Sequence, residues 1–185
     1  MNKASEIDFF IVGQGLAGAA VALQALARHY KVLVLDDPSQ NRSSLVAAGL
    51  FNPVSGRKML KTWLADQIFP VLNRYYSDVE RLTGKKFFYP MPLYRPFESV
   101  KEQNAWMGKS ADSRYKGYIH SFSLPDHYVG KVRSPFGGIV FNQAGYLDTV
   151  TYLDAVRQYL DDRGAYQCGV FDPDRLEVHE NHVRY

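Results

Sequence analysis

Short hydrophobic runs and one alanine-rich stretch alternate along the first 36 residues. The hydrophobic run of residues 7–12 predicts a strand, and the small apolar residues from 16 to about 29 predict a closely packed helix. A second run, residues 31–35, ends in Asp36 and predicts another strand. Strand, helix and strand in this order indicate a parallel βαβ unit.

The middle of the chain changes its periodicity twice. An amphipathic pattern begins at Lys58, runs to residue 82 and stops before Gly84, which predicts a long helix that Pro70 bends or splits. Residues 85–141 are rich in aromatic, β-branched and turn residues, which favours a β-rich lobe. Residues 99–107 could add a short helix to that lobe.

The last part of the chain returns to the first pattern. Apolar positions over residues 149–162, between Asp148 and Gly164, predict a helix. Three short strands, residues 167–171, 176–179 and 182–185, are then expected to form a terminal meander.

Three glycines follow the first strand with the spacing G-x-G-x-x-G. Gly13 suits a tight turn, Gly15 removes a side chain that would block a pyrophosphate, and Gly18 lets the helix pack closely on the sheet. The backbone N–H groups at the start of that helix, around Leu16 and Ala17, would face the phosphates. Together with its strands, this motif predicts a dinucleotide site.

An acidic residue stands where such a site binds ribose. Asp36 lies eighteen residues after Gly18 and can accept protons from both ribose hydroxyls, with Asp37 as the second candidate. The two carboxylates with Pro38 could instead form a polar turn. Asp36 would repel a 2′-phosphate, which disfavours NADP.

Composition fits a folded domain and narrows the setting. Of the 185 residues 46% are hydrophobic and 22% charged, with a net charge of +3 and no basic run, so nucleic acid is neither supported nor excluded as a partner. Cys168 is the single cysteine, which favours a reducing, cytoplasmic location. No segment reaches the about 18 apolar residues of a membrane span.

With these residues, the chain resembles the N-terminal half of FAD-dependent oxidoreductases related to D-amino acid oxidase, glycine oxidase and sarcosine oxidase. Beyond the glycine motif, the resemblance rests on a serine-led, alanine-rich segment, on the inserted β-rich lobe, and on Gly145-Tyr146-Leu147-Asp148 followed by a helix and a strand containing Val170. It implies FAD as cofactor, with Val170 at the adenine. The serine-led segment would run from the pyrophosphate to the flavin through Ser43, Ser44, Ala47, Ala48, Gly49 and Leu50.

The expected fold is α/β: a Rossmann-like FAD-binding domain of the glutathione-reductase type, discontinuous over residues 1–84 and 142–185, with residues 85–141 inserted as part of a substrate domain. The final strand barely begins at His182, so the domain is expected to be truncated at its C-terminus, inactive alone and able to pair with a second copy.

The expected function is oxidation of a C–N bond in an amine or amino acid by hydride transfer to flavin. An aminomethyl group on a modified tRNA base remains a possible substrate. The alternatives are a nicotinamide-dependent dehydrogenase and a nucleotide-binding fragment without turnover. No catalytic residue is identified.

Two further patterns have competing interpretations. His179 and His182 with Glu180 resemble a metal-binding spacing, but a solvated hairpin turn explains them better, and no metal is expected. Arg57 and Lys58 follow the flavin segment, where a cation could stabilise a reduced ring or simply face solvent.

Overall fold

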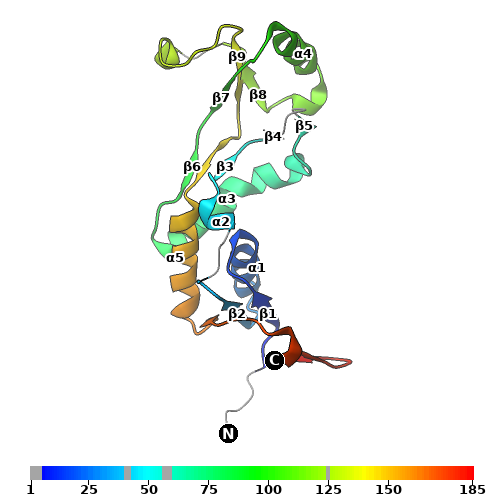
Figure 1. The fold of residues 1–185 in the computed structure, drawn as a ribbon, viewed down its shortest axis with the longest axis vertical. Coiled ribbons are helices and arrows are strands. Elements are labelled where there is room, and N and C mark those ends of the chain that lie inside the picture. The colour runs from blue at the N-terminus through cyan, green and yellow to red at the C-terminus, as the bar shows by residue number, and fades with distance from the viewer. Residues whose placement is uncertain (1–5, 40–42, 56–59, 124–125) are drawn as a thin grey trace. The chain divides into compact units, whose positions relative to one another are not determined.

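The computed structural model describes residues 6–39, 43–55, 60–123 and 126–185. They form two compact units, the first made of Met1–Ala47 with Thr149–Tyr185 and the second of Ala48–Asp148 (Figure 1). A discontinuous first unit was expected. The predicted domain boundaries at residues 84 and 142 nevertheless fall inside the second unit.

Aromatic packing explains why residues 48–84 lie with the β-rich lobe. Phe51 stacks on Phe88 with ring centroids 5.1 Å apart, and Phe69 contacts the ring of Tyr118 at 6.1 Å. These contacts join the segment before residue 84 to Phe88 and Tyr118 of the lobe, which the linear pattern of apolar residues could not show.

The first unit is built on a three-stranded parallel sheet in the order β1-β2-β11. The strands are β1 (Phe9–Val12), β2 (Val32–Asp36) and β11 (Tyr166–Cys168), and each outer strand pairs with β2 in parallel register. Parallel strands need crossover connections, which the helices on either side of β2 in sequence supply.

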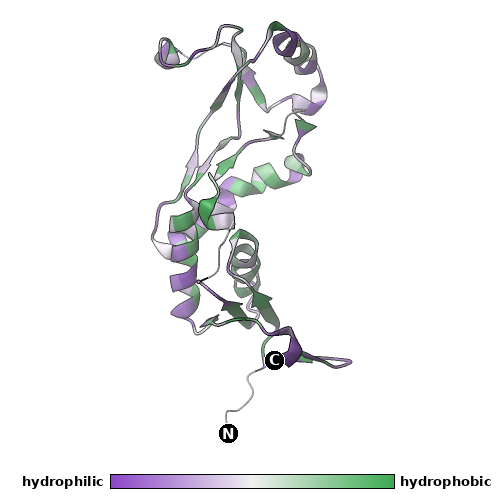
Figure 2. Ribbon diagram, in the orientation of Figure 1, coloured by the Kyte–Doolittle hydropathy of each residue, from purple (hydrophilic) through white to green (hydrophobic). Residues whose placement is uncertain are grey.

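Two helices accompany this sheet, α1 (Leu16–Leu26) and α5 (Thr149–Asp161), together with the single turn α2 (Ser43–Val46). Both main helices confirm the predicted ones, although α1 ends three residues early, before His29 at φ +64°. Figure 2 shows β1 and β2 as hydrophobic and the C-terminal end of α5 as largely hydrophilic. Of the three strands, the central β2 is the most buried.

The predicted terminal meander is wrong. The first of its three strands, β11, joins the parallel sheet beside β2, while β12 (Glu177–Val178) and β13 (Val183–Arg184) pair only with each other among the described residues. The single-turn helix η3 (Pro173–Arg175) separates β11 from this hairpin. Pairing with a distant strand depends on the sheet that β2 already forms, which is why local alternation did not reveal it.

The second unit is rich in β-strands, as predicted, and its strands pair antiparallel. One sheet has the order β3-β10-β6, a second has the order β7-β9-β8, and β4 pairs with β5. The strands are β3 (Leu50–Phe51), β4 (Val54–Ser55), β5 (Leu60–Lys61), β6 (Phe88–Pro90), β7 (Leu93–Pro96), β8 (Ile119–Ser121), β9 (Gly138–Phe141) and β10 (Gly145–Leu147).

The helices of the second unit are α3 (Ala65–Thr83), α4 (Val100–Ser110), η1 (Ser113–Tyr115) and η2 (Asp126–Tyr128). α3 begins later than the predicted helix and continues through Pro70 without being split. Gly84 ends α3 at φ +66°, as predicted. α4 extends the predicted short helix to Ser110, with the Ser99 hydroxyl capping it.

Buried aromatic residues form the core between α4 and the β7-β9-β8 sheet. Trp106 of α4 is fully buried and meets Phe141 of β9 edge to face, with ring centroids 5.4 Å apart. Ile139 and Tyr115 belong to the same cluster. The inserted lobe therefore has its own hydrophobic core.

Candidate functional site

The glycine motif adopts the tight turn that its spacing predicts. Gly13 has φ +91°, and its N–H donates to the carbonyl of Leu35 at 2.8 Å, which ties the end of β1 to β2. A Cβ on Gly18 would lie 2.0 Å from the carbonyl oxygen of Gly13, so only glycine lets α1 approach this turn. A Cβ on Gly15 would meet only the Ser44 hydroxyl, at 3.3 Å.

The N-terminus of α1 opens beside Gly15. Gly15 is the N-cap and supplies no side-chain cap, and no acidic residue stands in the first turn. The Leu16 N–H donates to the Ser44 hydroxyl at 3.3 Å, a long contact. The first-turn amides, which include those of Ala17 and Gly18, lack helical partners and carry the positive end of the helix dipole. Ser44 therefore lies beside the start of α1.

Asp36 ends β2 and is almost fully buried, with 6% of its surface exposed. One of its carboxylate oxygens accepts from the Gln14 N–H at 2.9 Å, and the other accepts from the Tyr166 hydroxyl at 3.1 Å. Gln14 is buried as well, and its side-chain amide donates to the Leu153 carbonyl at 2.9 Å. The carboxylate is therefore fixed by the glycine turn and by β11, which excludes a simple solvated turn.

Asp37 takes a different part. It is half-buried, and one of its oxygens accepts from the Ser39 N–H at 3.0 Å and from the Ser39 hydroxyl at 2.6 Å. Asp37 thus closes the polar turn that follows β2.

A hollow of about 280 Å³ lies at the carboxyl ends of the three parallel strands. It brings together four residues predicted from the sequence, Gly13, Asp36, Asp37 and Val170, with four that were not predicted, Val12, Leu35, Gly169 and Phe171. Ligands of parallel α/β sheets bind at this edge. Val170 lies two residues beyond the end of β11, not within a strand.

Aromatic side chains support one wall of this hollow. Phe171 stacks on Tyr185 with ring centroids 5.2 Å apart, and Phe10 of β1 lies 5.1 Å from the same tyrosine ring. The Tyr185 hydroxyl donates to the Val170 carbonyl at 3.3 Å and accepts from the Asp172 N–H at 2.9 Å. Tyr185 therefore holds the wall formed by residues 170–172. No spacing rule pointed to it, because the contact depends on the return of the β12–β13 hairpin.

The predicted flavin segment crosses from the first unit into the second. Ser43 to Val46 form α2, and residues 48–50 lead into β3. The segment is apolar yet open, with Val46 85% and Leu50 63% exposed, and Ala47 and Ala48 are exposed too.

Gly49 is required by the protein itself. It has φ +70°, and a Cβ there would lie 1.9 Å from the Leu147 carbonyl oxygen. The Leu147 N–H donates to the Gly49 carbonyl at 3.0 Å. The close approach of β10 is enough to require glycine at this position. Gly49 therefore does not by itself indicate a neighbouring flavin ring. Arg57 and Lys58, the cations predicted nearby, lie outside the described residues.

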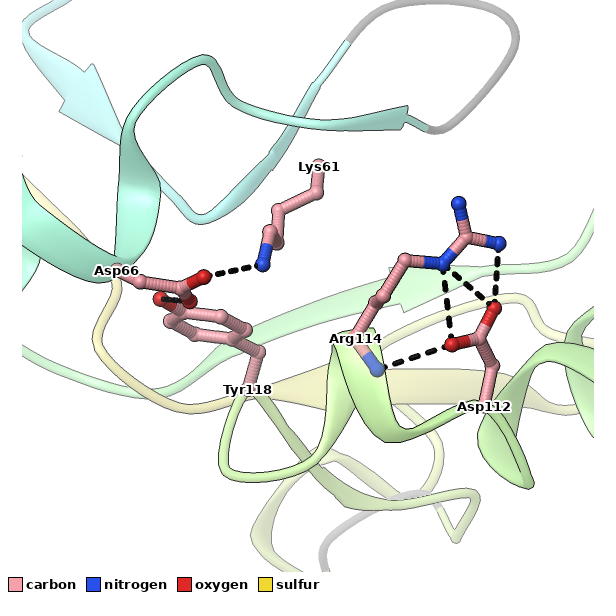
Figure 3. Close-up of polar contacts among 5 residues, drawn as sticks. All are labelled: Lys61, Asp66, Asp112, Arg114 and Tyr118. Atoms are coloured by element: carbon pink, nitrogen blue, oxygen red, sulfur yellow. Dashed lines mark hydrogen bonds and ion pairs between the residues drawn. The ribbon is translucent and has the colours of Figure 1, made fainter.

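The second unit contains a polar cluster centred on Asp66 (Figure 3). Its carboxylate accepts from Lys61 Nζ at 2.5 Å and from the Tyr118 hydroxyl at 2.7 Å. The Lys61 and Tyr118 hydrogen bonds lower the pKa of Asp66, whereas burial and the Asp66 hydrogen bond raise the pKa of Tyr118 to about 12. At neutral pH this cluster is an ion pair with a protonated phenol, which joins β5 to α3.

Asp112 and Arg114 form a second pair nearby (Figure 3). The guanidinium of Arg114 donates to both carboxylate oxygens of Asp112, and this lowers the pKa of Asp112 to about 2. Asp66 and Asp112 in Figure 3 are thus held ionised. This suits stabilisation of the second unit by ion pairs rather than proton transfer near neutral pH.

The His179 to His182 segment forms the turn of the β12–β13 hairpin, as its second interpretation predicted. The His179 N–H donates to the His182 carbonyl at 2.9 Å, and the two imidazoles stack with ring centroids 4.5 Å apart. Within the described ranges no group of three or more histidine, cysteine or acidic side chains could hold a metal ion. In the same ranges no helix is both long and apolar enough to cross a membrane.

A family model described as FAD dependent oxidoreductase matches residues 8–169. Among solved structures, glycine oxidase from Bacillus cereus is similar with a TM-score of 0.73 and 20% identity, over 96% of this chain and 50% of that one. Iminodiacetate oxidase from Chelativorans sp. is similar with a TM-score of 0.71 and 13% identity, over 94% of this chain and 49% of that one. L-proline dehydrogenase from P. horikoshii has a TM-score of 0.70 and 10% identity, over 98% of this chain and 48% of that one. The chain thus spans about half the length of these proteins.

Proposed function

This chain belongs to the FAD dependent oxidoreductase family, and on that premise we propose that its first unit binds the ADP half of FAD in the hollow at the ends of β1, β2 and β11. One observation carries the proposal: an open glycine turn, a helix N-terminus and a fixed carboxylate meet at one edge of a parallel sheet. Each suits a different part of a nucleotide diphosphate.

The adenosine portion fits the apolar side of the hollow. Val12 is 52% and Val170 70% exposed there, so a planar base would cover aliphatic surface that is now open to water. Asp36 is placed to accept from ribose hydroxyls, and Asp37 stands beside it. A dianionic 2′-phosphate next to these carboxylates would be repelled, which favours FAD over NADP.

The pyrophosphate is assigned to the start of α1. Gly13 and Gly15 leave space for it, since a Cβ on Gly13 would meet nothing within 4 Å. The amides of Leu16, Ala17 and Gly18 supply donors. Ser44 already contacts the Leu16 amide, and together with Ser43 it would border the phosphates.

The flavin end is assigned to residues 47–50. Ala47, Ala48 and Leu50 are exposed, and small side chains allow backbone amides to approach a planar ring. The second unit is assigned to the substrate domain, as the resemblance implies.

For the whole protein we propose oxidation of a C–N bond in a small amine or amino acid. Bound FAD accepts the hydride in this chemistry, while the protein orients the substrate and excludes water. The names of the similar structures, which act on glycine, iminodiacetate and L-proline, support this substrate class. An aminomethyl group on a modified tRNA base has the same reacting bond. The exposed free thiol of Cys168 suits a reducing, cytoplasmic location.

Titration of the purified chain with FAD tests the proposed cofactor. We expect saturable binding with quenching of flavin fluorescence, competition by ADP, and much weaker competition by NADP. Binding of NAD in preference to FAD would favour the nicotinamide-dependent alternative. FAD binding by the full-length protein without oxygen or acceptor consumption on any amine would contradict the proposed reaction while leaving the cofactor assignment intact.

A further inference from the structure

Tyr166 lies at the start of β11, and its hydroxyl reaches the carboxylate at the end of β2. The parallel register pairs Tyr166 with Val34 and Cys168 with Asp36. Side chains two residues apart in a strand share one face of the sheet, about 6.6 Å apart. Tyr166 therefore points along the same face as Asp36, and a phenol is long enough to cover that distance.

The hydrogen bond completes a two-sided support for Asp36. Tyr166 donates to one carboxylate oxygen at 3.1 Å, while the Gln14 N–H donates to the other at 2.9 Å. Gln14 is in turn anchored by its side-chain amide at the Leu153 carbonyl. Two donors on different oxygens restrict rotation of the carboxyl group. Asp36 is also buried, and it lines the hollow in which a ribose would have to meet it.

The hydroxyl of Tyr166 could act on a bound ribose in two opposite ways. It could hold the carboxylate in the orientation that accepts ribose hydroxyls, in which case its loss weakens binding. It could instead occupy an acceptor position that a ribose hydroxyl needs, in which case its loss strengthens binding. An ionised carboxylate offers about four acceptor sites on two oxygens, so it can accept from more than two donors at the same time.

We propose that Tyr166 is a positioning residue for nucleotide binding, which acts through Asp36 on the ribose hydroxyls. The inference rests on the proposed function. Tyr166 itself is absent from the lining of the hollow, whereas Asp36 lines it. Tyr166 thus acts from β11 by donating to the carboxylate of Asp36, which it helps to hold in one orientation.

The test measures binding of ADP and of 2′,3′-dideoxy-ADP to the parent chain and to Tyr166→Phe by calorimetry. We expect the variant to bind ADP about five- to tenfold more weakly, and dideoxy-ADP within about twofold of the parent. A purely structural effect of the substitution would weaken both ligands alike. Tyr159→Phe is the matched control, because this tyrosine lies on α5 with its ring against Arg163 and outside the hollow.

A double-mutant cycle tests whether the effect passes through Asp36. In the Asp36→Ala background, Tyr166→Phe should change ADP binding by less than about twofold. Unchanged or tighter ADP binding by Tyr166→Phe, or an equal loss of affinity for both nucleotides, would overturn the role of Tyr166 and leave the proposed function intact. If the parent chain binds neither FAD nor ADP, the proposed function fails and the inference with it.

Discussion

The carbonyl oxygen of Gly13 would lie only 2.0 Å from a Cβ on Gly18, so the turn and the helix that follows it meet backbone to backbone. Gly15, between them, has no such constraint. The three glycines of the motif thus have different roles. Gly18 permits close packing, Gly13 adopts a positive φ, and Gly15 leaves space for a ligand.

Gly18→Ala should destabilise the first unit. The methyl group cannot fit unless α1 moves away from the turn, and overpacking of this kind costs about 1–3 kcal/mol. Chemical denaturation of the parent and the variant measures the difference. A variant with unchanged stability would show that α1 can shift without cost.

Gly15→Val should weaken FAD binding by at least about tenfold, beyond a small loss of stability from replacing the N-cap of α1. A Cβ at Gly15 meets the Ser44 hydroxyl at 3.3 Å in the free protein, and the branched valine side chain would occupy the space assigned to the pyrophosphate. Gly108→Val is the matched control, since a Cβ there meets nothing within 4 Å and the residue lies on α4 of the second unit. Normal FAD affinity in Gly15→Val would contradict the assignment of the pyrophosphate to this turn.

Asp36→Ala should weaken FAD binding by about tenfold to a hundredfold, the equivalent of losing a hydrogen bond to a charged group. It should also lower stability, because the Gln14 N–H loses its acceptor in a buried position. Asp8→Ala provides a control, as Asp8 accepts from the Lys31 N–H at 2.7 Å away from the hollow. If both variants retain parental FAD affinity, Asp36 is not the ribose ligand.

Gly49 is a poor place to test proximity to flavin, because any side chain there would collide with Leu147. Ala48→Trp is the better probe, since Ala48 is exposed in the same segment. We expect lower FAD retention at unchanged thermal stability. Ala111→Trp, at another exposed alanine of the second unit, should have no effect on retention. Equal retention in both variants would place the flavin elsewhere.

Stability should fall in alkaline solution through Tyr118. Its pKa in the folded chain is about 12, above the usual value of 10, because burial and the Asp66 hydrogen bond favour the protonated phenol. The folded state therefore holds this proton more tightly than the unfolded state. The contribution is complete below pH 10 and is lost as the pH rises towards 12.

Thermal unfolding at pH 9 and pH 11 measures this loss. Tyr118→Phe should lose less stability over the interval than the parent, because phenylalanine cannot ionise. Tyr159→Phe should behave as the parent does. Equal losses in the parent and in Tyr118→Phe would contradict the linkage.

Short-range patterns in the sequence were enough to predict the local features of this protein. The strand before Gly13, the helix after it and Asp36 at the end of the next strand are set by spacing within 36 residues. Turn chemistry and periodicity act over a few residues, so they can be read without the fold. The same holds for Gly84 at the end of α3.

Which distant residues come into contact is visible only in the folded structure. β11 pairs with β2 across about 130 positions of sequence, and this pairing brings Tyr166 to Asp36 and Val170 to the hollow. The folded structure also decided that residues 48–84 pack with the β-rich lobe and that Gly49 serves β10. Long-range pairing depends on which surfaces remain to be buried once local elements have formed, and neither spacing nor composition encodes that choice.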